Sequence, residues 1–457
     1  MIGIRAMQTI TEAARQTPVR RTVDVLVVGG GSAGLAAATS AARLGADVLL
    51  VEKNGYLGGT LAMVTLGSIC GLYTVTESEV IPVVKGFAGE LIERMDRLGS
   101  IKGPMRWLET ASLLYDPTTI KLVADDMVAE AGVNVALHSL AVGVVKDGAR
   151  VKGVVFEGRD GRWACMATTV VDCTGDANIA SLCDAEFEHD PSIIQAPTTM
   201  FRFGGVDTAR ATAMTRDELR NHLEKAVAAG LSLPRTAGGM FSLREGAMHL
   251  NITRVLRGNR SPDPLNTEEV TAAEIDGRRQ LKTYLEAFRR FVPGYENAFI
   301  ADIGSEIGVR ESRRIKGDYW LTLDDVLNEA RFEDSIACSA WPVEEHGAGR
   351  ATKWVFLKPG TYYELPFRML LPVGLDGLLV AGRCSSASHD AHASMRIAAV
   401  CMAMGEAAGV AAAQAGAGDI RKIDIGGLRR QLEKQGAIVG PLPNAGHHTK
   451  AEQVTTA

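Results

Sequence analysis

The fold of this chain is decided near its N-terminus by the stretch Val23-Asp24-Val25-Leu26-Val27-Val28-Gly29-Gly30-Gly31-Ser32-Ala33-Gly34. An apolar run of strand length leads into a G-x-G-x-x-G turn and a helical segment, and a second apolar run follows. In such a unit the first glycine makes the tight turn, the second lets the backbone approach a pyrophosphate, and the third lets the helix pack against the strand. Free N–H groups at the helix N-terminus then face the phosphates. The stretch predicts a dinucleotide-binding βαβ unit.

An acid at the end of the second strand narrows the choice of dinucleotide. Glu52 directly follows the apolar run that ends at Val51, near the offset at which a carboxylate accepts hydrogen bonds from the ribose hydroxyls. A carboxylate at this position disfavours a ribose 2′-phosphate. The residues therefore leave two cofactors open, FAD and NAD.

The composition sets limits on the class of protein. The chain has 457 residues, of which 46% are hydrophobic, enough for about two or three domains with cores of their own. A net charge of −5 is too small to indicate a nucleic acid as partner. Seven cysteines without a C-x-x-C pair indicate reduced thiols and a cytoplasmic protein. No uncharged apolar stretch is long enough to span a membrane, and the segment from Arg396 to Ala415 is expected to be a buried core helix.

The order of the segments predicts an interrupted nucleotide-binding domain. Three alternating segments between residues 141 and 171 are separated by D-G turns, which predict a small antiparallel insertion. The pattern changes at about residue 186, and a strand, glycine turn and helix return near Leu378. We therefore expect an α/β fold divided into an N-terminal arm (residues 1–21), a nucleotide-binding domain (22–185 and 364–440), an inserted α+β substrate or cap domain (186–363) and a mobile tail (441–457).

Further motifs accompany the glycine turn along most of residues 22–415. They are Gly55-Tyr56-Leu57-Gly58-Gly59-Thr60, Asp172-Cys173-Thr174-Gly175-Asp176, Gly308-Val309-Arg310-Glu311-Ser312-Arg313-Arg314, Ala381-Gly382-Arg383-Cys384-Ser385, and Ser394-Met395-Arg396 followed by Gly405-Glu406-Ala407-Ala408-Gly409. Together they resemble the FAD-dependent oxidoreductases with a glutathione-reductase-like FAD fold, distantly akin to the flavoprotein subunits of fumarate reductases. The resemblance implies a Rossmann-like FAD-binding domain with a parallel sheet, and FAD as the cofactor.

The resemblance also assigns residues to FAD. It places the pyrophosphate at the first glycine turn, the adenosine ribose at Glu52, the ribityl chain near Gly382, and the flavin pyrimidine edge at the helix that follows Met395. The residues expected to bind FAD are Gly29, Gly31, Ser32, Ala33, Gly34, Glu52, Lys53, Gly59, Thr60, Thr174, Gly175, Asp176, Gly382, Arg383 and Arg396.

The candidate catalytic residues come from two segments. His389 and His392 lie in the loop between Arg383 and the flavin-facing helix, and their ordinary pKa suits proton transfer; the alternative is that they only shape the loop. Arg310 and Arg313 suit a substrate carboxylate; the alternative is a buried Arg–Glu network that joins the two domains. No third ligand lies near the two histidines in the sequence, so no metal site is expected.

The expected reaction is hydride transfer between flavin N5 and a small organic substrate that carries a carboxylate. The alternatives are a flavin-dependent monooxygenase and a flavoprotein in which FAD is structural or senses a signal. A second G-x-G-x-x-G unit is missing from the sequence, so reduction by NAD(P)H is expected to be slow. The sequence leaves the electron donor or acceptor unknown, and it leaves a homo-oligomer open.

Overall fold

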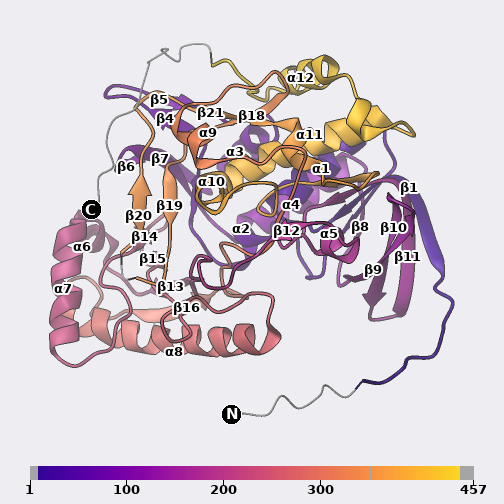
Figure 1. The fold of residues 1–457 in the computed structure, drawn as a ribbon. Helices are drawn as coiled ribbons and strands as arrows, with labels where there is room; N and C mark the ends of the chain where they lie inside the picture. The colour runs from indigo at the N-terminus through magenta and orange to yellow at the C-terminus, as the bar shows by residue number, and fades with distance from the viewer. Residues whose placement is uncertain (1–8, 350, 443–457) are drawn as a thin grey trace.

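A seven-stranded sheet forms the centre of the computed structural model, which describes residues 9–349 and 351–442 (Figure 1). Four strands follow the spatial order β8 (Asn134–Ala136), β2 (Val48–Val51), β1 (Val19–Val28) and β11 (Gly161–Asp172). On its other side, β11 pairs with both β22 (Leu378–Val380) and β10 (Arg150–Gly158). The edge strand β9 (Leu140–Asp147) pairs with β10. The first four strands and β22 are mutually parallel. Their carboxyl ends therefore meet at one edge, where α/β sheets bind their ligands. The predicted α/β fold with a Rossmann-type parallel sheet is confirmed.

The small antiparallel insertion branches from β11. The last residues of this strand pair with β22, whereas its first residues pair with β10 in antiparallel register. The three long strands β9, β10 and β11 project together on the right of Figure 1, joined by the D-G turns that the sequence indicated. The insertion therefore extends the sheet away from the carboxyl edge of the parallel strands.

Two helices rich in small residues cross in the centre of the molecule. α1 (Ser32–Arg43) and α11 (Ala398–Ala415) lie side by side (Figure 1). A Cβ added to Gly405 would lie 2.0 Å from the carbonyl oxygen of Ala33, and one added to Gly409 would lie 2.1 Å from that of Ala37. Glycines in α11 therefore allow the two backbones to touch. The segment of α11 is long and apolar enough to cross a membrane by length and composition, but 72% of it is buried inside the fold, as expected of a core helix.

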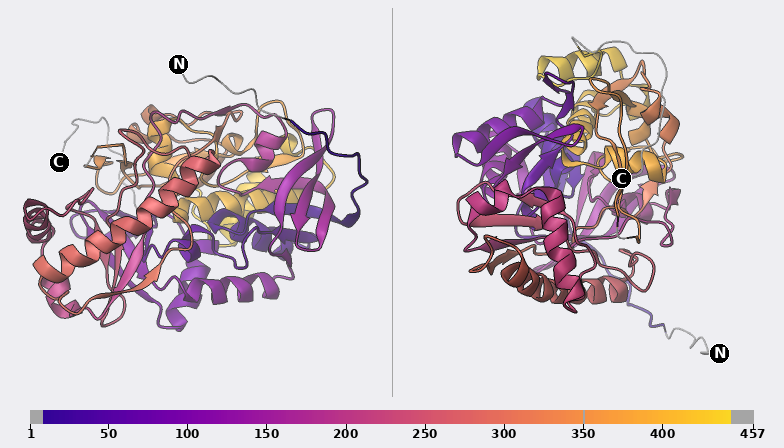
Figure 2. Two further views of the ribbon diagram at one scale, coloured as in Figure 1. Left: turned by 90° about the horizontal axis from the view of Figure 1, so that it is seen from below. Right: turned by 90° about the vertical axis from the view of Figure 1, so that its left-hand side faces the viewer.

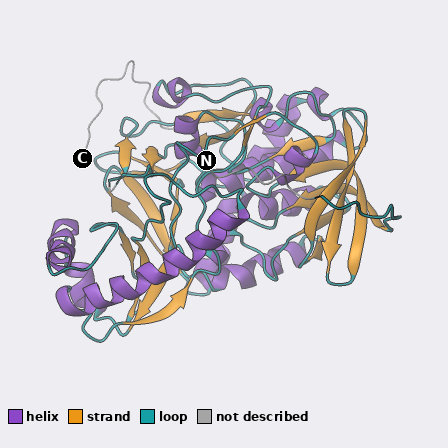
Figure 3. Ribbon diagram, turned by 60° about the horizontal axis from the view of Figure 1, so that its bottom comes forward, coloured by secondary structure: helices purple, strands orange, loops and turns teal. Residues whose placement is uncertain are grey.

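The inserted part is built on a second sheet with its own core. Its strands follow the order β14 (Gly239–Phe241), β15 (Ala247–Asn251), β13 (Phe201–Gly204) and β16 (Phe299–Ile303), and its helices are α6 (Thr208–Ala213), α7 (Arg216–Ala228) and α8 (Thr267–Phe291). Aromatic residues such as Phe203, Phe288 and Tyr295 meet edge to face in this core. Figures 2 and 3 show α8 running as one long helix along this sheet, which we name the cap sheet.

The hydrophobic cores place the domain boundaries at other residues than those predicted from the sequence. Leu321, Ile336 and Tyr363 belong to the same hydrophobic core as α1 and α11, although the sequence placed them in the cap. We therefore place the end of the cap near residue 310 instead of 363. At the N-terminus, β1 begins at Val19, inside the expected arm, and residues 1–8 of that arm lie outside the described residues.

The C-terminal prediction also needs a correction. Leu442, expected in a mobile tail, is buried, and its backbone N–H donates a hydrogen bond of 3.1 Å to the hydroxyl of Tyr362. Residues 443–457 of the predicted tail lie outside the described residues.

Shorter elements complete the fold around the main sheet. They are α2 (Thr60–Met63), β3 (Ser68–Cys70), β4 (Tyr73–Val75), β5 (Val80–Pro82), α3 (Phe87–Arg97), β6 (Ile101–Trp107), β7 (Thr110–Tyr115), α4 (Thr119–Glu130), α5 (Asn178–Leu182), β12 (Phe187–Glu188), β17 (Arg314–Ile315), α9 (Leu323–Leu327), β18 (Ser335–Ser339), β19 (Val343–Glu345), β20 (Lys353–Val355), β21 (Tyr363–Pro366), the 3-10 turns η1 (Phe367–Leu370) and η2 (Ile420–Lys422), α10 (His389–Met395) and α12 (Ile425–Lys434). The hairpin of β19 and β20 lies near the cap sheet (Figure 1).

Candidate active site

A cavity of about 330 Å³ opens at the carboxyl edge of the parallel strands. Its lining begins with residues that directly follow β1, β2, β11 and β22, namely Gly29, Glu52, Cys173 and Ala381. It continues to Phe241 and Asn251 of the cap sheet and to Glu344 and Trp354 of the β19–β20 hairpin. The cavity therefore joins the dinucleotide turn to a second compartment beneath the cap.

The glycine turn is shaped for a pyrophosphate. A Cβ on Gly31 would meet only the Cα of Gly59, at 3.7 Å, so the turn is open on its cavity side. A Cβ on Gly34 would instead lie 1.7 Å from the carbonyl oxygen of Gly29, which is the close helix–strand packing that the sequence predicted. No side chain among the described residues caps the N-terminus of α1. Its first N–H groups are left for an anion.

Glu52 is held in place by the turn itself. One carboxylate oxygen accepts a hydrogen bond from the N–H of Gly30 at 2.7 Å, and the other accepts one from the N–H of Asn54 at 2.8 Å. Each oxygen keeps a lone pair for a ribose hydroxyl. The residue therefore fits the role of ribose acceptor in an orientation fixed before the nucleotide binds.

The middle of the cavity is organised around Asp176 and Arg383. The carboxylate of Asp176 accepts hydrogen bonds from Ser312 at 2.6 Å and from Arg383 at 2.8 Å. Burial opposes ionisation of Asp176, but the charge of Arg383 and the hydrogen bonds outweigh it and lower its pKa. Every residue that the resemblance assigned to FAD lines the cavity except Gly34, which lies behind the turn. The lining therefore fits FAD.

The second compartment contains two buried arginines, of which the sequence analysis named only Arg310 as a candidate. Arg235 and Arg310 are each only 7% exposed, line the cavity, and form no ion pair within residues 9–349 and 351–442. Arg310 donates to the carbonyl of Ala196 and to the hydroxyl of Thr198 at 2.7 Å, while Nε of Arg235 has no hydrogen-bond partner in the described part. Burial lowers the pKa of both guanidinium groups. Arg310 therefore lines the cavity, and its role toward a substrate stays a prediction.

An acid and a histidine that the sequence missed face these arginines. Glu344 accepts hydrogen bonds from Nε2 of His346 at 2.9 Å and from the indole N–H of Trp341 at 3.2 Å. The hydroxyl of Thr352 lies 3.2 Å from Nδ1 of His346. This arrangement assigns the imidazole proton to Nε2.

Charges around the pair set its protonation state. Burial and then Arg310 lower the pKa of His346 to about 3. Burial opposes ionisation of Glu344, but His346, Arg396 and Arg310 hold its pKa at about 2. At neutral pH the pair is a carboxylate bonded to a neutral imidazole. No spacing in the sequence indicated it, because the pair meets the arginines only through tertiary contacts.

Three of the four predicted catalytic residues lie outside the cavity lining. His392 is fully buried, its Nε2 lies 2.8 Å from the carbonyl oxygen of Arg383, and burial lowers its pKa to about 3. Arg313 donates to the carbonyl of Asp176 at 3.0 Å. The contacts of His392 shape the loop, which was the alternative weighed for it. Arg313 contacts Asp176 and Asn178 and pairs with no glutamate in the described part of the chain, so it does not form the Arg–Glu network that was its alternative.

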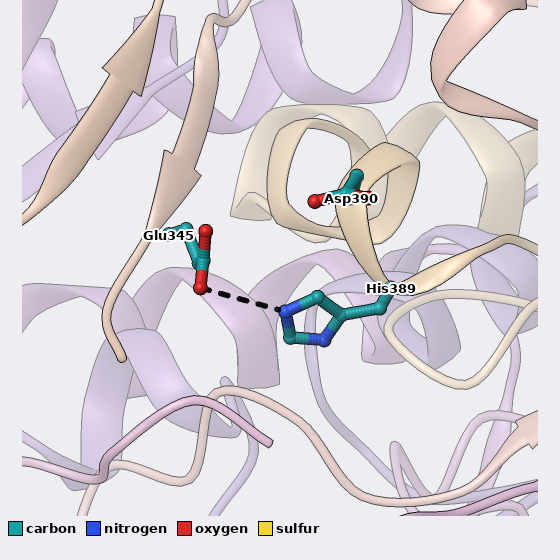
Figure 4. Close-up of side chains that lie close together, drawn as sticks. All are labelled: Glu345, His389 and Asp390. Carbon is teal, nitrogen blue, oxygen red and sulfur yellow. Dashed lines mark ion pairs between the residues drawn. The ribbon is translucent and has the colours of Figure 1, made fainter. Parts of the chain in front are cut away.

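His389 belongs to a buried ion-pair network. Its Nδ1 lies 2.9 Å from a carboxylate oxygen of Glu311, and Nε of Arg314 lies 3.1 Å from the same oxygen. The expectation that no third metal ligand lies near the histidines was wrong. Glu345 and Asp390 lie beside His389, and one potential ligand atom from each of the three residues falls within 4.8 Å of the other two (Figure 4). Glu311 already holds His389, and Lys353 pairs with Glu345 at 3.3 Å. The group is therefore satisfied as an ion-pair network.

Comparison with known proteins identifies the family. The profile of the FAD dependent oxidoreductase family matches residues 24–432, and the chain belongs to this family. It is an enzyme of the FAD-dependent oxidoreductase class, and its cofactor is FAD.

The curated relatives share only short segments with the chain. Glutathione reductase of Schizosaccharomyces pombe is 56% identical over 43 residues, which are 9% of this chain and 9% of that protein. Thiamine thiazole synthase of Aeropyrum pernix is 63% identical over 38 residues, or 8% of this chain and 14% of that protein. The chain therefore matches a small part of each relative.

Solved structures align over more of the chain at low identity. A geranylgeranyl bacteriochlorophyll reductase-like protein of Thermoplasma acidophilum aligns with a TM-score of 0.44 and 17% identity, covering 91% of this chain and 82% of that chain. A flavin-dependent brominase aligns with a TM-score of 0.48 and 14% identity, covering 91% and 84%. At these values the similarity says nothing about the substrate.

Proposed function

We propose that this enzyme transfers hydride between flavin N5 and a small organic carboxylate bound in the compartment beneath the cap. The observation that carries the proposal is a single cavity that runs from the dinucleotide turn to Arg235 and Arg310, two buried cations without an ion-pair partner in the described part of the chain. A buried charge is costly unless it is paired. A bound carboxylate supplies the missing partner and fixes the substrate beside the flavin.

The chain's own residues divide the remaining tasks. The planar guanidinium of Arg310, held by Thr198, orients one carboxylate. Arg396 lies before α11 and donates to Gln195 at 3.1 Å, which places positive charge at the flavin end. Bound FAD supplies the hydride acceptor or donor at N5. The cap sheet closes the compartment from the side opposite the main sheet.

Hydride transfer to flavin N5 also requires a group that takes the proton released by the substrate. On the substrate side of the cavity, Glu344 and His346 are the carboxylate and the imidazole of the described lining, because Glu52, Asp176 and Glu306 belong to its nucleotide side. Oxidation of a substrate alcohol or amine also releases the proton of its hydroxyl or amine group. The carboxylate of Glu344, hydrogen-bonded to His346, is placed to take this proton once a carboxylate bound to Arg310 offsets the positive charge that lowers the pKa of both groups. His389 and His392 do not reach the cavity.

The test compares Glu344→Gln with His389→Gln, which removes a titratable group outside the cavity. We expect Glu344→Gln to slow flavin reduction by substrate by ~10²–10⁴-fold while FAD stays bound, the usual effect of losing a general acid or base. His389→Gln should leave this rate unchanged. The measurement is anaerobic stopped-flow bleaching of the flavin with a panel of small carboxylates.

Two results would contradict the proposal. If His389→Gln slows flavin reduction and Glu344→Gln does not, the proton leaves through the ion-pair network of α10. If the product contains an oxygen atom from O₂, the enzyme is a monooxygenase.

A further inference from the structure

Aromatic residues are concentrated at one wall of the compartment. The chain has five tryptophans, and three of them, Trp107, Trp341 and Trp354, line the cavity. The ring centroids of Trp107 and Trp354 are 5.3 Å apart, and those of Trp341 and Trp354 are 6.3 Å apart. We name these three residues the tryptophan wall. They come from β6, β20 and the loop before β19, so only the fold brings them together.

The wall is rigid on its outer side and open toward the cavity. Phe356 stacks on Trp354 with a centroid distance of 5.6 Å and an interplanar angle of 9°, and the indole N–H of Trp341 is held by Glu344. Trp107 remains 39% exposed. Aromatic surface of this kind favours a flat ring, because stacked or edge-to-face rings attract each other beyond the area that they bury.

Positive charge lies at the same end of the cavity. Arg235 is buried, its Nε has no hydrogen-bond partner in the described part, and its pKa is lowered by burial and by Arg216, while Glu344 raises it. The guanidinium carbon of Arg216 stands 5.9 Å from the ring centroid of Trp107. A buried guanidinium with an unused donor beside an aromatic wall matches a ligand with a carboxylate attached to a ring.

We propose that the substrate is an aromatic carboxylate, with its ring against the tryptophan wall and its carboxylate on Arg235 and Arg310. The inference rests on the proposed function, since it specifies the carboxylate that the compartment takes. Other occupants fit less well. An aliphatic acid leaves the wall without a stacking partner, and a neutral aromatic compound leaves Arg235 unpaired.

The experiment measures binding to the FAD-loaded enzyme without turnover. Benzoate, cyclohexanecarboxylate and benzyl alcohol are titrated, and binding is read from tryptophan fluorescence and from the flavin absorption spectrum. We expect benzoate to bind ~2–10-fold more tightly than cyclohexanecarboxylate, the range set by aromatic pairing. Benzyl alcohol should bind weakest, because it cannot pair with Arg235.

Variants assign the two parts of the recognition. Trp354→Leu should remove the preference for benzoate over cyclohexanecarboxylate, and Trp354→Phe should restore it. Trp320→Leu, outside the cavity lining, is the matched control and should leave the preference intact. Arg235→Gln should weaken both acids by ~10–100-fold, as expected for the loss of a charge-assisted hydrogen bond.

The outcomes separate this inference from the proposed function. Equal binding of the two acids to the wild type overturns the aromatic assignment and leaves the carboxylate site standing. Loss of FAD in Trp354→Leu with unchanged acid binding also overturns it, because the wall then holds the flavin. If no acid binds at all, the carboxylate site itself fails, and the proposed function with it.

Discussion

Two glycines of the dinucleotide turn illustrate how one residue type serves two purposes. The missing side chain of Gly31 leaves space for the ligand, whereas that of Gly34 lets α1 touch the backbone of the turn. Gly31 has φ of −80°, a value that any residue adopts. The two positions therefore respond differently to the same substitution.

A comparison of Gly31→Val and Gly34→Val tests this difference. Gly31→Val should lose most of its FAD, while the unfolding free energy of the apoprotein changes by less than ~0.5 kcal/mol, because its side chain points into open space. Gly34→Val should lose both FAD and ~1–3 kcal/mol or more of stability, because its Cβ overlaps the backbone. FAD content after purification and urea unfolding of the apoproteins measure the two effects. Gly89→Val on α3, where the surroundings are open, is the control.

Full FAD occupancy in Gly31→Val would contradict the assignment of the turn to the pyrophosphate. A destabilised Gly31→Val apoprotein would show that the turn, like Gly34, has a packing role.

At the level of elements, the crossing of α1 and α11 forms part of the cavity wall. α11 begins at the cavity, where Ile397 and Ala398 line it, and its glycines lie against α1. The contact of Gly405 with Ala33 therefore supports the start of α1, whereas on α11 it lies in the middle of the helix. Its close approach depends on Gly405 and Gly409, since any side chain there would meet a carbonyl oxygen.

Gly409→Val should destabilise the protein by ~1–3 kcal/mol, the usual cost of overpacking. Ala413→Val, one turn further along the same helix and only partly buried, is the matched control and should cost no more than about 0.7 kcal/mol, the range of helix propensity. Chemical unfolding followed by circular dichroism measures both. Equal effects would mean that the crossing tolerates a wider separation than the contact distances indicate.

At the level of the whole molecule, buried charges join the cap to the FAD-binding domain. Oε2 of Glu311 accepts a hydrogen bond from the N–H of Gln195 at 3.2 Å, and its other oxygen is shared by His389 and Arg314. Gln195 lies near the start of the cap, Glu311 follows its end, and His389 begins α10. The network therefore ties together both connections of the cap and the loop beside the flavin.

The network makes part of the stability depend on pH. Burial opposes protonation of His389, but Glu311, Asp390 and Glu345 outweigh it and raise its pKa above the ordinary value of about 6.5. As the pH rises, the unfolded chain therefore loses the proton of His389 at a lower pH than the folded protein does. This contribution is fully present below about pH 6.5 and is lost as the pH rises through the folded pKa.

We therefore expect the difference in Tm between the wild type and His389→Gln to be larger at pH 6 than at pH 9. Thermal unfolding at several pH values, with FAD in excess, measures the difference. His222→Gln, on α7 in the cap and away from the network, is the control and should show no such dependence. A constant difference across the range would mean that His389 stabilises the fold as a neutral hydrogen-bonding group.

The sequence alone determined the nucleotide half of the protein. The apolar runs around Gly29 and Glu52 specified a parallel sheet, because short-range periodicity and glycine spacing are properties of neighbouring residues. Most of the expected FAD residues line the cavity for the same reason: they lie just after the ends of β1, β2, β11 and β22, and parallel strands bring their carboxyl ends to one edge. The D-G turns likewise identified the antiparallel insertion.

Only the tertiary structure decided the substrate half. Glu344 and Trp354 pair across the β19–β20 hairpin, whereas Arg235 comes from a distant part of the chain, and no local spacing links it to them. His389 and His392 were attractive from sequence because they lie close to the flavin-facing helix, but the turn into α10 directs them into ion pairs and backbone contacts. Side-chain direction and burial depend on how the cap and the β19–β20 hairpin pack on the FAD-binding domain. These long-range contacts, and not the local pattern, determine which charges face the cavity.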